Sequence, residues 1–302
     1  MKYLYYPGCS LKGTGRAYEE SLLAVFDTLN IALEELEDWN CCGATAYMSI
    51  SELKAFALSA RNFALAERQN GAYQKTQLLV PCAACYLGLN KAQHYLNEYP
   101  ELMSTVKEAL GEAGLTLSGP VNIRHPLDVI YNDIGIKTMK ENVVRPLEGL
   151  KVACYYGCQI VRPYADFDDQ SQPYTMDKII QSLGAETIEW PLKTRCCGGS
   201  LTGTIKDVGL RLSYIIINEA KRRGCDMIAT GCPLCQFNLE CYQKEMRKLY
   251  GNERDIPIVF FTQIIGMALG INPRKLGLHR LFISPLTAFR KRATSGGVHV
   301  HS

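Results

Sequence analysis

The stretch CCGATAYMSISELKAFALSARNFALAERQNGAYQKTQLLVPCAAC, residues 41–85, contains the pattern on which the fold depends. Two adjacent cysteines, Cys41 and Cys42, open it, and the CxxC pair Cys82 and Cys85 closes it. Between the pairs, apolar residues recur at helical spacing over residues 51–69, and a short apolar run follows at residues 77–80. The pattern predicts a helix and then a buried strand that ends at the second pair of cysteines.

The same order of features returns later in the chain as CCGGSLTGTIKDVGLRLSYIIINEAKRRGCDMIATGCPLC, residues 196–235. A further cysteine precedes each copy, Cys9 after the letters YYPG and Cys158 after YYG. The spacing is C-x31-CC-x39-CxxC in the first half and C-x37-CC-x34-CxxC in the second. Three elements in one order at similar distances, found twice, indicate an internal duplication.

Short apolar segments alternate with amphipathic ones throughout both halves. Strands are predicted near residues 2–6, 31–36, 77–80, 121–124, 152–155, 187–190, 227–230 and 258–261. Helices are predicted over residues 16–29, 51–69, from 84 onward, and over 126–133, 174–183, 204–223, 233–249 and 263–269. We therefore expect an α/β fold of two pseudo-symmetric halves, each a small, mostly parallel sheet with flanking helices. Residues 142–149 contain Pro146 and Gly149 and are the expected boundary, which gives units 1–145 and 146–302.

The composition is that of a globular protein, with 302 residues, 47% of them hydrophobic and 21% charged. A formal net charge of +3, from basic residues scattered along the chain, argues against a nucleic-acid partner. No apolar run approaches the roughly 18–20 residues of a membrane span, and the start MKYLYYPGCS does not resemble a signal peptide. We expect a soluble, cytoplasmic protein.

The thirteen cysteines need a separate explanation, because an odd number cannot pair completely within one chain. Cytosolic thiols stay reduced, so dense cysteines there are typically metal ligands or redox groups. Five matched cysteines per half are one more than a tetrahedral zinc ion needs. Adjacent cysteines also point in different directions, which suits a cluster of several iron atoms. Structural zinc and a thioredoxin-like dithiol are the alternatives.

The doubled spacing resembles the paired cysteine-rich (CCG) domains of the catalytic B subunit of heterodisulfide reductase. The resemblance covers nearly the whole chain, including NIRHPLDVIYNDIG at residues 122–135 and LGINPRKLGLHRLFISP at residues 269–285. It implies two noncubane [4Fe–4S] clusters, at which the two sulfurs of a small-molecule disulfide each receive one electron. The implied ligands are five cysteines for each cluster: Cys9, Cys41, Cys42, Cys82 and Cys85 for one, and Cys158, Cys196, Cys197, Cys232 and Cys235 for the other.

Electrons must come from partner subunits, because the chain has no nucleotide-binding glycine motif and no flavin fingerprint. The resemblance implies a ferredoxin-like C subunit and a flavin-containing A subunit. The alternative function is an iron–sulfur electron-relay or quinone-linked anchor subunit of a succinate or fumarate reductase-type complex. In that case the basic segment over residues 279–302 would make a peripheral membrane contact. His299 and His301 in that segment are weak candidates for metal binding.

Two features of the cysteine pattern depart from strict repetition. The gap of 39 residues between Cys42 and Cys82 is about five residues longer than the resemblance leads us to expect. We assign the extra residues to the loop at residues 71–76, where an insertion costs little stability. The second half offers Cys154 as well as Cys158 for its leading cysteine. The repeat aligns YPGC with YYGC, so Cys158 is chosen, and Cys154 is expected to pack or to support the cluster.

Several polar residues near the cysteines have both a functional and a structural interpretation. Arg124 and His125 follow a predicted strand and are candidates for binding an anionic substrate or delivering a proton, or else form a structural pair. Lys12 and Arg162 follow the leading cysteines and could meet a substrate carboxylate or phosphate, although such residues are more often solvated. His94 is expected on the surface.

Two further cysteines, Cys225 and Cys241, have no counterpart in the first half. Cys225 takes the place of Ala72 in the repeat and is expected to be a packed thiol.

Overall fold

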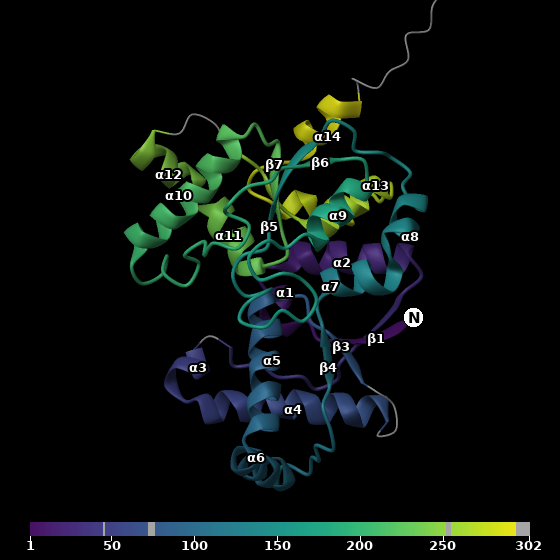
Figure 1. The fold of residues 1–302 in the computed structure, drawn as a ribbon, viewed down its shortest axis with the longest axis vertical. Coiled ribbons are helices and arrows are strands. Elements are labelled where there is room, and N and C mark those ends of the chain that lie inside the picture. Colours follow the sequence, from purple (N-terminus) through teal and green to yellow (C-terminus); the bar gives the residue numbers. More distant parts are fainter. Residues whose placement is uncertain (45, 72–75, 252–254, 294–302) are drawn as a thin grey trace, which may run out of the picture.

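The computed structural model describes residues 1–44, 46–71, 76–251 and 255–293. Two separate four-stranded sheets form its centre, and all paired strands in both are parallel (Figure 1). The first sheet has the order β2 (Ala32–Glu35), β1 (Lys2–Tyr5), β3 (Gln77–Leu79), β4 (Asn122–Arg124). The second has the order β6 (Glu186–Thr187), β5 (Lys151–Tyr155), β7 (Met227–Thr230), β8 (Ile258–Phe260). The prediction of an α/β fold with two similar halves is confirmed.

Helices connect the strands in the same order in both halves. Those of the first half are α1 (Gly8–Lys12), α2 (Arg16–Thr28), α3 (Ala46–Ile50), α4 (Glu52–Asn70), α5 (Ala83–Glu98), α6 (Pro100–Glu112), α7 (Pro126–Asp128), the π-helix η1 (Val129–Ile134) and α8 (Ile136–Glu141). Those of the second half are α9 (Thr175–Ser182), α10 (Lys206–Arg222), α11 (Pro233–Cys241), α12 (Gln243–Tyr250), α13 (Phe261–Ala268), the 3-10 turn η2 (Leu278–Arg280) and α14 (Leu286–Ala293).

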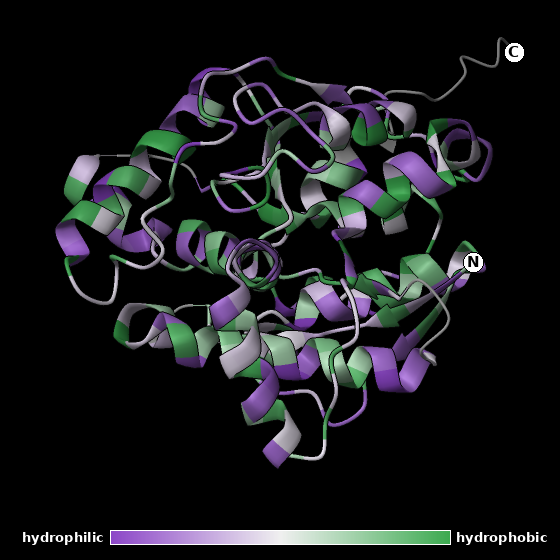
Figure 2. Ribbon diagram, turned by 60° about the horizontal axis from the view of Figure 1, so that its bottom comes forward, coloured by the Kyte–Doolittle hydropathy of each residue, from purple (hydrophilic) through white to green (hydrophobic). Residues whose placement is uncertain are grey.

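The central strands are buried on both faces, which explains why they occur in the sequence as continuous apolar runs. All four residues of β7 and the last four of β5 are buried, whereas the edge strand β2 is exposed or half-buried throughout. The helices are striped with hydrophobic and hydrophilic residues, because one face packs on neighbouring strands or helices (Figure 2). Local signals fix their starts: the Ser51 side chain accepts a hydrogen bond from the Lys54 N–H at α4, and Pro233 occupies the first turn of α11.

The structure differs from the sequence-based expectation in a few elements. The helix predicted over residues 233–249 is divided at Tyr242 into α11 and α12. The strand predicted over 187–190 is the short β6, although the Ile188 N–H still bonds to the Val152 carbonyl at 3.2 Å. The region predicted as one helix over 126–133 continues from α7 into η1. The helices α1, α3 and α8 have five or six residues each, too short to give a periodic signal.

The two halves are joined by helices that follow their first and last strands. Helix α2 of the first half packs on α13 of the second, while η1 and α8 of the first pack on α9 of the second. At the first contact, the buried hydroxyls of Ser21 and Thr262 lie 2.6 Å apart. Tyr18 stacks on Phe260 beside them, with ring centroids 4.5 Å apart. The interface therefore repeats the pseudo-symmetry of the two sheets.

Replacing Ser21 with alanine should destabilise the protein through this interface. The Ser21 hydroxyl donates to the Tyr18 carbonyl, so the Thr262 hydroxyl is the donor to Ser21 and would lose its buried acceptor. We expect S21A to lower the free energy of unfolding by about 1–3 kcal/mol, measured by chemical denaturation. T28A is the control, because that exposed hydroxyl bonds only within its own helix. Equal stability of S21A and T28A would contradict the role given to Ser21.

Candidate functional site

The leading cysteine and the CxxC pair of each half meet at one point of each sheet. Cys9 follows β1 and Cys82 follows β3, and these strands are neighbours from which the chain continues in opposite directions, to β2 and to β4. Cys158 and Cys232 have the same positions after β5 and β7. The crevice outside the carboxyl ends of such strands is where open α/β sheets bind ligands. The predicted cysteines therefore lie where the topology favours a site.

The first cysteine set comprises Cys9, Cys41, Cys42, Cys82 and Cys85. Hydrogen bonds between side chains connect Cys41 to Cys42, Cys42 to Cys85, and Cys85 to Cys82, and the Cys9 thiol lies within electrostatic reach of Cys41. The bond from Cys41 is the main cause that lowers the pKa of the Cys42 thiol to about 4. The thiolate is the form of cysteine that binds metals. All five predicted residues are brought together.

The second cysteine set comprises Cys158, Cys196, Cys197, Cys232 and Cys235. The sulfurs of Cys197 and Cys235 lie 3.3 Å apart, and their hydrogen bond is the main cause that lowers the pKa of Cys197 to about 7. Cys235 also bonds to Cys232, and Cys158 bonds to Cys196. Burial, followed by the negative charges of Cys196, Cys197 and Cys232, raises the pKa of Cys158 to about 12.

Cys154 lies apart from the second cysteine set. It is fully buried within β5, and burial followed by the charge of Asp177 raises the pKa of its thiol. The structure thus supports the choice of Cys158. Cys225 is also fully buried and Cys241 partly buried at the end of α11, and neither thiol interacts with a member of either set.

Glycines let the backbone pass close to the buried sulfurs. Gly8 and Gly157 have φ of +65° and +71°, and a Cβ there would lie 2.9 Å from the Cys85 sulfur and 3.2 Å from the Cys235 sulfur. Beside them, the Tyr6 hydroxyl donates to the carbonyl of the residue before Cys41 (2.8 Å), and the Tyr155 hydroxyl donates to the carbonyl before Cys196 (2.6 Å). Each tyrosine thus fixes the approach of the CC pair to its own half.

Two serines that sequence reasoning missed hold the CC pairs from the other side. Ser59 of α4 donates to the Cys42 carbonyl at 3.0 Å, and Ser213 of α10 donates to the Cys197 carbonyl at 2.8 Å. They occupy the same place in the aligned segments LSARN and LSYII, so the repeat itself carried this signal. Ser59 comes 17 residues after Cys42 and Ser213 comes 16 after Cys197, so most of the longer first-half gap follows Ser59. The predicted place for it, residues 71–76, falls largely outside the described residues.

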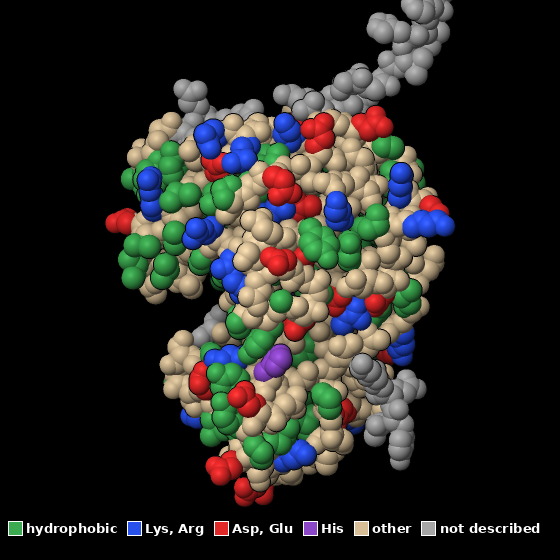
Figure 3. All heavy atoms as spheres, viewed as in Figure 1, with side chains coloured by type: hydrophobic (Ala, Val, Ile, Leu, Met, Phe, Trp, Pro, Cys, Tyr) green, Lys and Arg blue, Asp and Glu red, His purple; other side chains and the backbone are tan. Residues whose placement is uncertain are grey.

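Each cysteine set has a solvent side and an interior side. Cys9, Cys41 and Cys196 are exposed and Cys158 is partly exposed, whereas the second cysteine of each CC pair and both CxxC pairs are buried. Backbone N–H groups point at the exposed side: that of Gly43 donates to the Cys41 sulfur at 3.5 Å and that of Gly198 to the Cys196 sulfur at 3.3 Å. In Figure 3 the surface is hollowed between the lobe of α10 and α12 and the lobe of α3 and α4.

The CxxC loops of the two sets lie close to the interface between the halves. A Cβ on Gly15, in the turn between α1 and α2, would lie 3.0 Å from Pro233, which stands between Cys232 and Cys235. His125 spans both CxxC loops, with Nε2 3.2 Å from the Pro81 carbonyl and its ring against Gly231. These contacts connect the surroundings of one set to those of the other.

The donor set fits a cluster of several atoms better than a single ion. Within the described part of the chain, no three His, Cys, Asp or Glu side chains converge closely enough to hold one metal ion. In the first set Cys41, Cys42, Cys85 and Cys82 form a row of pairwise contacts, with the Gly43 N–H at the Cys41 end and Gly8 against Cys85. In the second set Cys158 contacts Cys196, and Cys235 contacts both Cys197 and Cys232. Five thiols and small neighbouring residues suit several iron atoms bound by different thiolates.

Each guanidinium nitrogen of Arg124 bonds to a residue outside the two cysteine sets. Its guanidinium forms ion pairs with Asp128 and, at 3.1 Å, with Asp133, and it donates to Gln77. These contacts tie the end of β4 to η1 and favour the structural interpretation.

His125 is also held by the fold. Its Nδ1 accepts the Leu127 N–H at 3.2 Å, so the proton of the neutral ring lies on Nε2, which faces the Pro81 carbonyl. Burial lowers the pKa of the imidazole to about 3, so the ring stays neutral. Its position between the two CxxC loops makes it a spacer rather than a free acid or base.

The other predicted candidates that the structure describes are Lys12, Arg162 and His94, and each contacts a residue outside the cysteine sets. Lys12 forms ion pairs with Glu19 at 2.7 Å and Glu35 at 2.8 Å, and Arg162 donates to Thr194. His94 is exposed, as expected, and stacks on Tyr164 of the second half. His299 and His301 lie outside the described residues.

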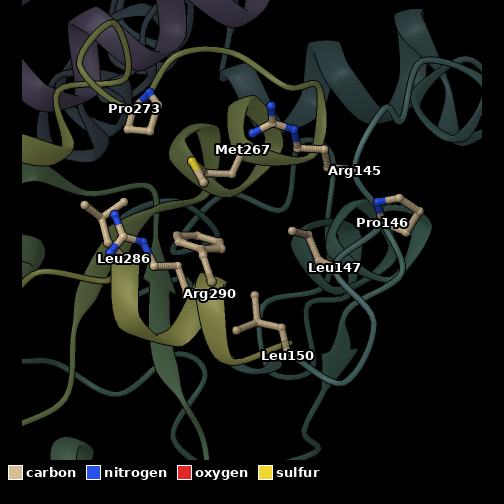
Figure 4. A pocket seen from close by; sticks show the side chains of 9 residues that line it. Arg145, Pro146, Leu147, Leu150, Met267, Pro273, Leu286 and Arg290 are labelled. Atoms are coloured by element: carbon tan, nitrogen blue, oxygen red, sulfur yellow. The ribbon is translucent and has the colours of Figure 1, made fainter. Parts of the chain in front are cut away.

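A pocket of about 290 Å³ lies beside the segment that links the two halves, and no cysteine lines it (Figure 4). Apolar side chains and two arginines line it: Arg145, Pro146, Leu147, Leu150, Met267, Pro273, Leu286, Phe289 and Arg290. Helix α14, from the basic C-terminal segment, forms one wall. Over the residues that the structure covers, no helix combines the length and apolarity of a membrane span.

Replacing Gly8 should destabilise the protein for a local steric reason. G8A would combine the strain of a positive φ, about 1–2 kcal/mol, with a clash against the Cys85 sulfur, about 1–3 kcal/mol more. G114A is the matched control, with φ +67° and no atom within 4 Å of the new Cβ. Chemical denaturation should show a larger loss of unfolding free energy for G8A, and equal losses would argue against the close approach.

Comparison with known proteins gives a consistent result. The cysteine-rich domain family (CCG) matches residues 3–90 and 152–240. The chain is 30% identical over 280 residues to the 8-methylmenaquinol:fumarate reductase membrane anchor subunit of Wolinella succinogenes, covering 92% of this chain and 95% of that one. It is 28% identical over 278 residues to the B subunit of the ferredoxin:CoB-CoM heterodisulfide reductase of Methanosarcina mazei, covering 90% and 91%.

Two further likenesses agree with these. A protein of Archaeoglobus profundus, named as similar to the B subunit of heterodisulfide reductase, is 29% identical over 283 residues, covering 91% of this chain and 93% of that one. A crystal structure of a hypothetical protein from Helicobacter pylori matches the fold with a TM-score of 0.72 at 16% identity. That match covers 93% of this chain but only 51% of the other. The chain therefore belongs to the family with a duplicated CCG cysteine-rich domain that includes the B subunit of heterodisulfide reductase, as its cysteine spacing indicated.

Proposed function

We propose that this chain is the catalytic subunit of a heterodisulfide reductase-like complex, which holds two noncubane [4Fe–4S] clusters and reduces a small-molecule disulfide or oxidises the thiols. The observation that carries the proposal is the meeting of two matched five-cysteine sets across the interface between the halves. Each set would hold one cluster through its five sulfurs.

The chemistry requires two electrons for one bond. Reduction of a disulfide takes two electrons and two protons, breaks the S–S bond and gives two thiols. A bound iron–sulfur cluster supplies one electron at a time, so two clusters beside one substrate provide the pair. The chain contributes the geometry: its exposed Cys9, Cys41 and Cys196 leave one side of each set open, and the buried cysteines keep water from the other.

Partner subunits would deliver the electrons. The relatives of Methanosarcina mazei and Wolinella succinogenes are themselves named as subunits of larger reductases. We propose a ferredoxin-like C subunit and a flavin-containing A subunit as the partners, since the chain has no flavin or nucleotide fingerprint of its own.

A second candidate is an electron-relay subunit linked to a quinone pool. The similarity to a fumarate reductase membrane anchor subunit, at 30% identity over 92% of this chain, favours it. The clusters would then pass electrons onward, and the basic C-terminal segment with α14 would dock at the membrane surface. The open side of each cysteine set favours the disulfide reaction, because a relay needs no access for a substrate.

Replacing one cysteine in each set should remove one cluster only. Protein purified anaerobically should hold about eight irons and eight acid-labile sulfides per chain. C41S and C196S should each lose about half of both. C241S is the control, because this partly buried thiol belongs to neither set. Stoichiometric zinc with little iron in the unmodified protein would refute the cluster proposal.

Electron paramagnetic resonance should distinguish the two candidate functions. The complex with its partners, reduced and then mixed with a disulfide, should give a new signal that depends on the disulfide if the clusters react with it. Oxidation of the clusters by a quinone analogue, with no change on adding disulfides, would instead establish the relay function.

A further inference from the structure

One buried hydroxyl near the two cysteine sets has no hydrogen-bond partner. Tyr18 of α2 is fully buried, and within the part of the chain that the structure describes its hydroxyl bonds to nothing. Buried tyrosine hydroxyls are nearly always paired, because an unpaired one costs about 1–3 kcal/mol. An orphan of this kind at a site suggests that its partner belongs to a group the site binds.

The surroundings hold this hydroxyl in place between the two sets. The Tyr18 ring stacks on Phe260 with centroids 4.5 Å apart and planes at 4°, and it meets the edge of Phe261. Burial is the main cause that raises the pKa of Tyr18 well above its ordinary value, and negative charge first from Cys82 and then from Cys232 adds to it. One CxxC sulfur from each half therefore lies within electrostatic reach of the hydroxyl, which stays protonated and is able to donate a hydrogen bond.

The two halves differ at the start of the helix that follows the leading cysteine. Helix α2 starts seven residues after Cys9, whereas α9 starts 17 residues after Cys158. The third residue of α2 is Tyr18, while the third residue of α9 is Asp177, whose carboxylate accepts a hydrogen bond from the Tyr156 hydroxyl at 2.7 Å. The unpaired hydroxyl is therefore a feature of the first half.

We propose that the Tyr18 hydroxyl donates a hydrogen bond to a sulfur of the cluster held at Cys82, and so gives the first cluster a higher reduction potential than the second. The proposal rests on the proposed function, since it requires both clusters. Hydrogen bonds to the sulfurs of an iron–sulfur cluster stabilise its more negative, reduced form, which raises the potential. Tyr18 is thus a positioning residue, and it sets the order in which the two clusters accept electrons.

The test is a redox titration of Y18F, followed by electron paramagnetic resonance in the anaerobically purified, iron-loaded complex. The substitution keeps the ring stack and removes only a hydroxyl without a protein partner, so folding and iron content should match the unmodified protein. The midpoint potential of the first cluster should become more negative, while that of the second stays unchanged. Repeating Y18F in the C196S and C41S backgrounds assigns the shift, because each background retains one complete cysteine set.

Y214F is the matched control, since Tyr214 is a partly buried ring on α10 that packs against Tyr250, with the ring planes tilted by 38°. It should leave both potentials unchanged. Full iron content with no shift in Y18F, or a shift of the second cluster only, would overturn this inference and leave the proposed function intact. Absence of iron and sulfide from the unmodified protein would overturn both.

Discussion

Each half is organised around a contact between the end of its first strand and a sulfur of its CxxC pair. In a parallel sheet of order β2-β1-β3-β4, the chain leaves β1 and β3 in opposite directions, and the crevice between their ends is open. Gly8 narrows this crevice, because a residue with φ +65° and no side chain can bring its backbone against the Cys85 sulfur. Gly157 does the same beside Cys235. Once these two ends are in contact, the tyrosine two residues before each glycine, Tyr6 or Tyr155, bonds to the carbonyl that precedes the CC pair and joins this third segment to the other two.

The sequence was sufficient to predict the elements whose signal is local or repeated. Buried parallel strands are apolar on both faces, so they stand out as short apolar runs, and the repeat showed which cysteines belong together. The division of α11 from α12 at Tyr242 was not predictable, because apolar periodicity continues through it. At the division the Gln243 side chain bonds both to the Leu239 carbonyl of α11 and to the backbone of Ile256, 13 residues later and beyond α12. The roles of Arg124 and His125 were hidden for the same reason, since their partners Gln77 and Pro81 lie more than forty residues earlier.

The interface between the halves connects fold and site directly. Two of the helices that join the halves, α2 and α9, follow the strands β1 and β5 that lead to Cys9 and Cys158. The packing that holds the halves together therefore also bears on the placement of the two sets. The hydroxyl pair of Ser21 and Thr262 lies one helical turn from Tyr18, and His125 fills the space between Pro81 and Gly231 with a neutral ring. A charged imidazole there would carry a large desolvation cost, which its lowered pKa avoids. The same contacts therefore stabilise the interface and hold the surroundings of the two cysteine sets in place.

A duplicated site begins with two equal environments, and the two halves of this chain differ more on one side of the site than on the other. The solvent sides stay similar, since Cys41 and Cys196 are both exposed and each accepts a glycine N–H. The interior sides diverge. Asn238 donates to the Cys197 carbonyl from α11, whereas Gly88 takes the corresponding place on α5 and packs closely on Ala44. Under the proposed function, a substrate approaching from solvent would thus meet two nearly equal faces, while the groups behind them differ between the halves.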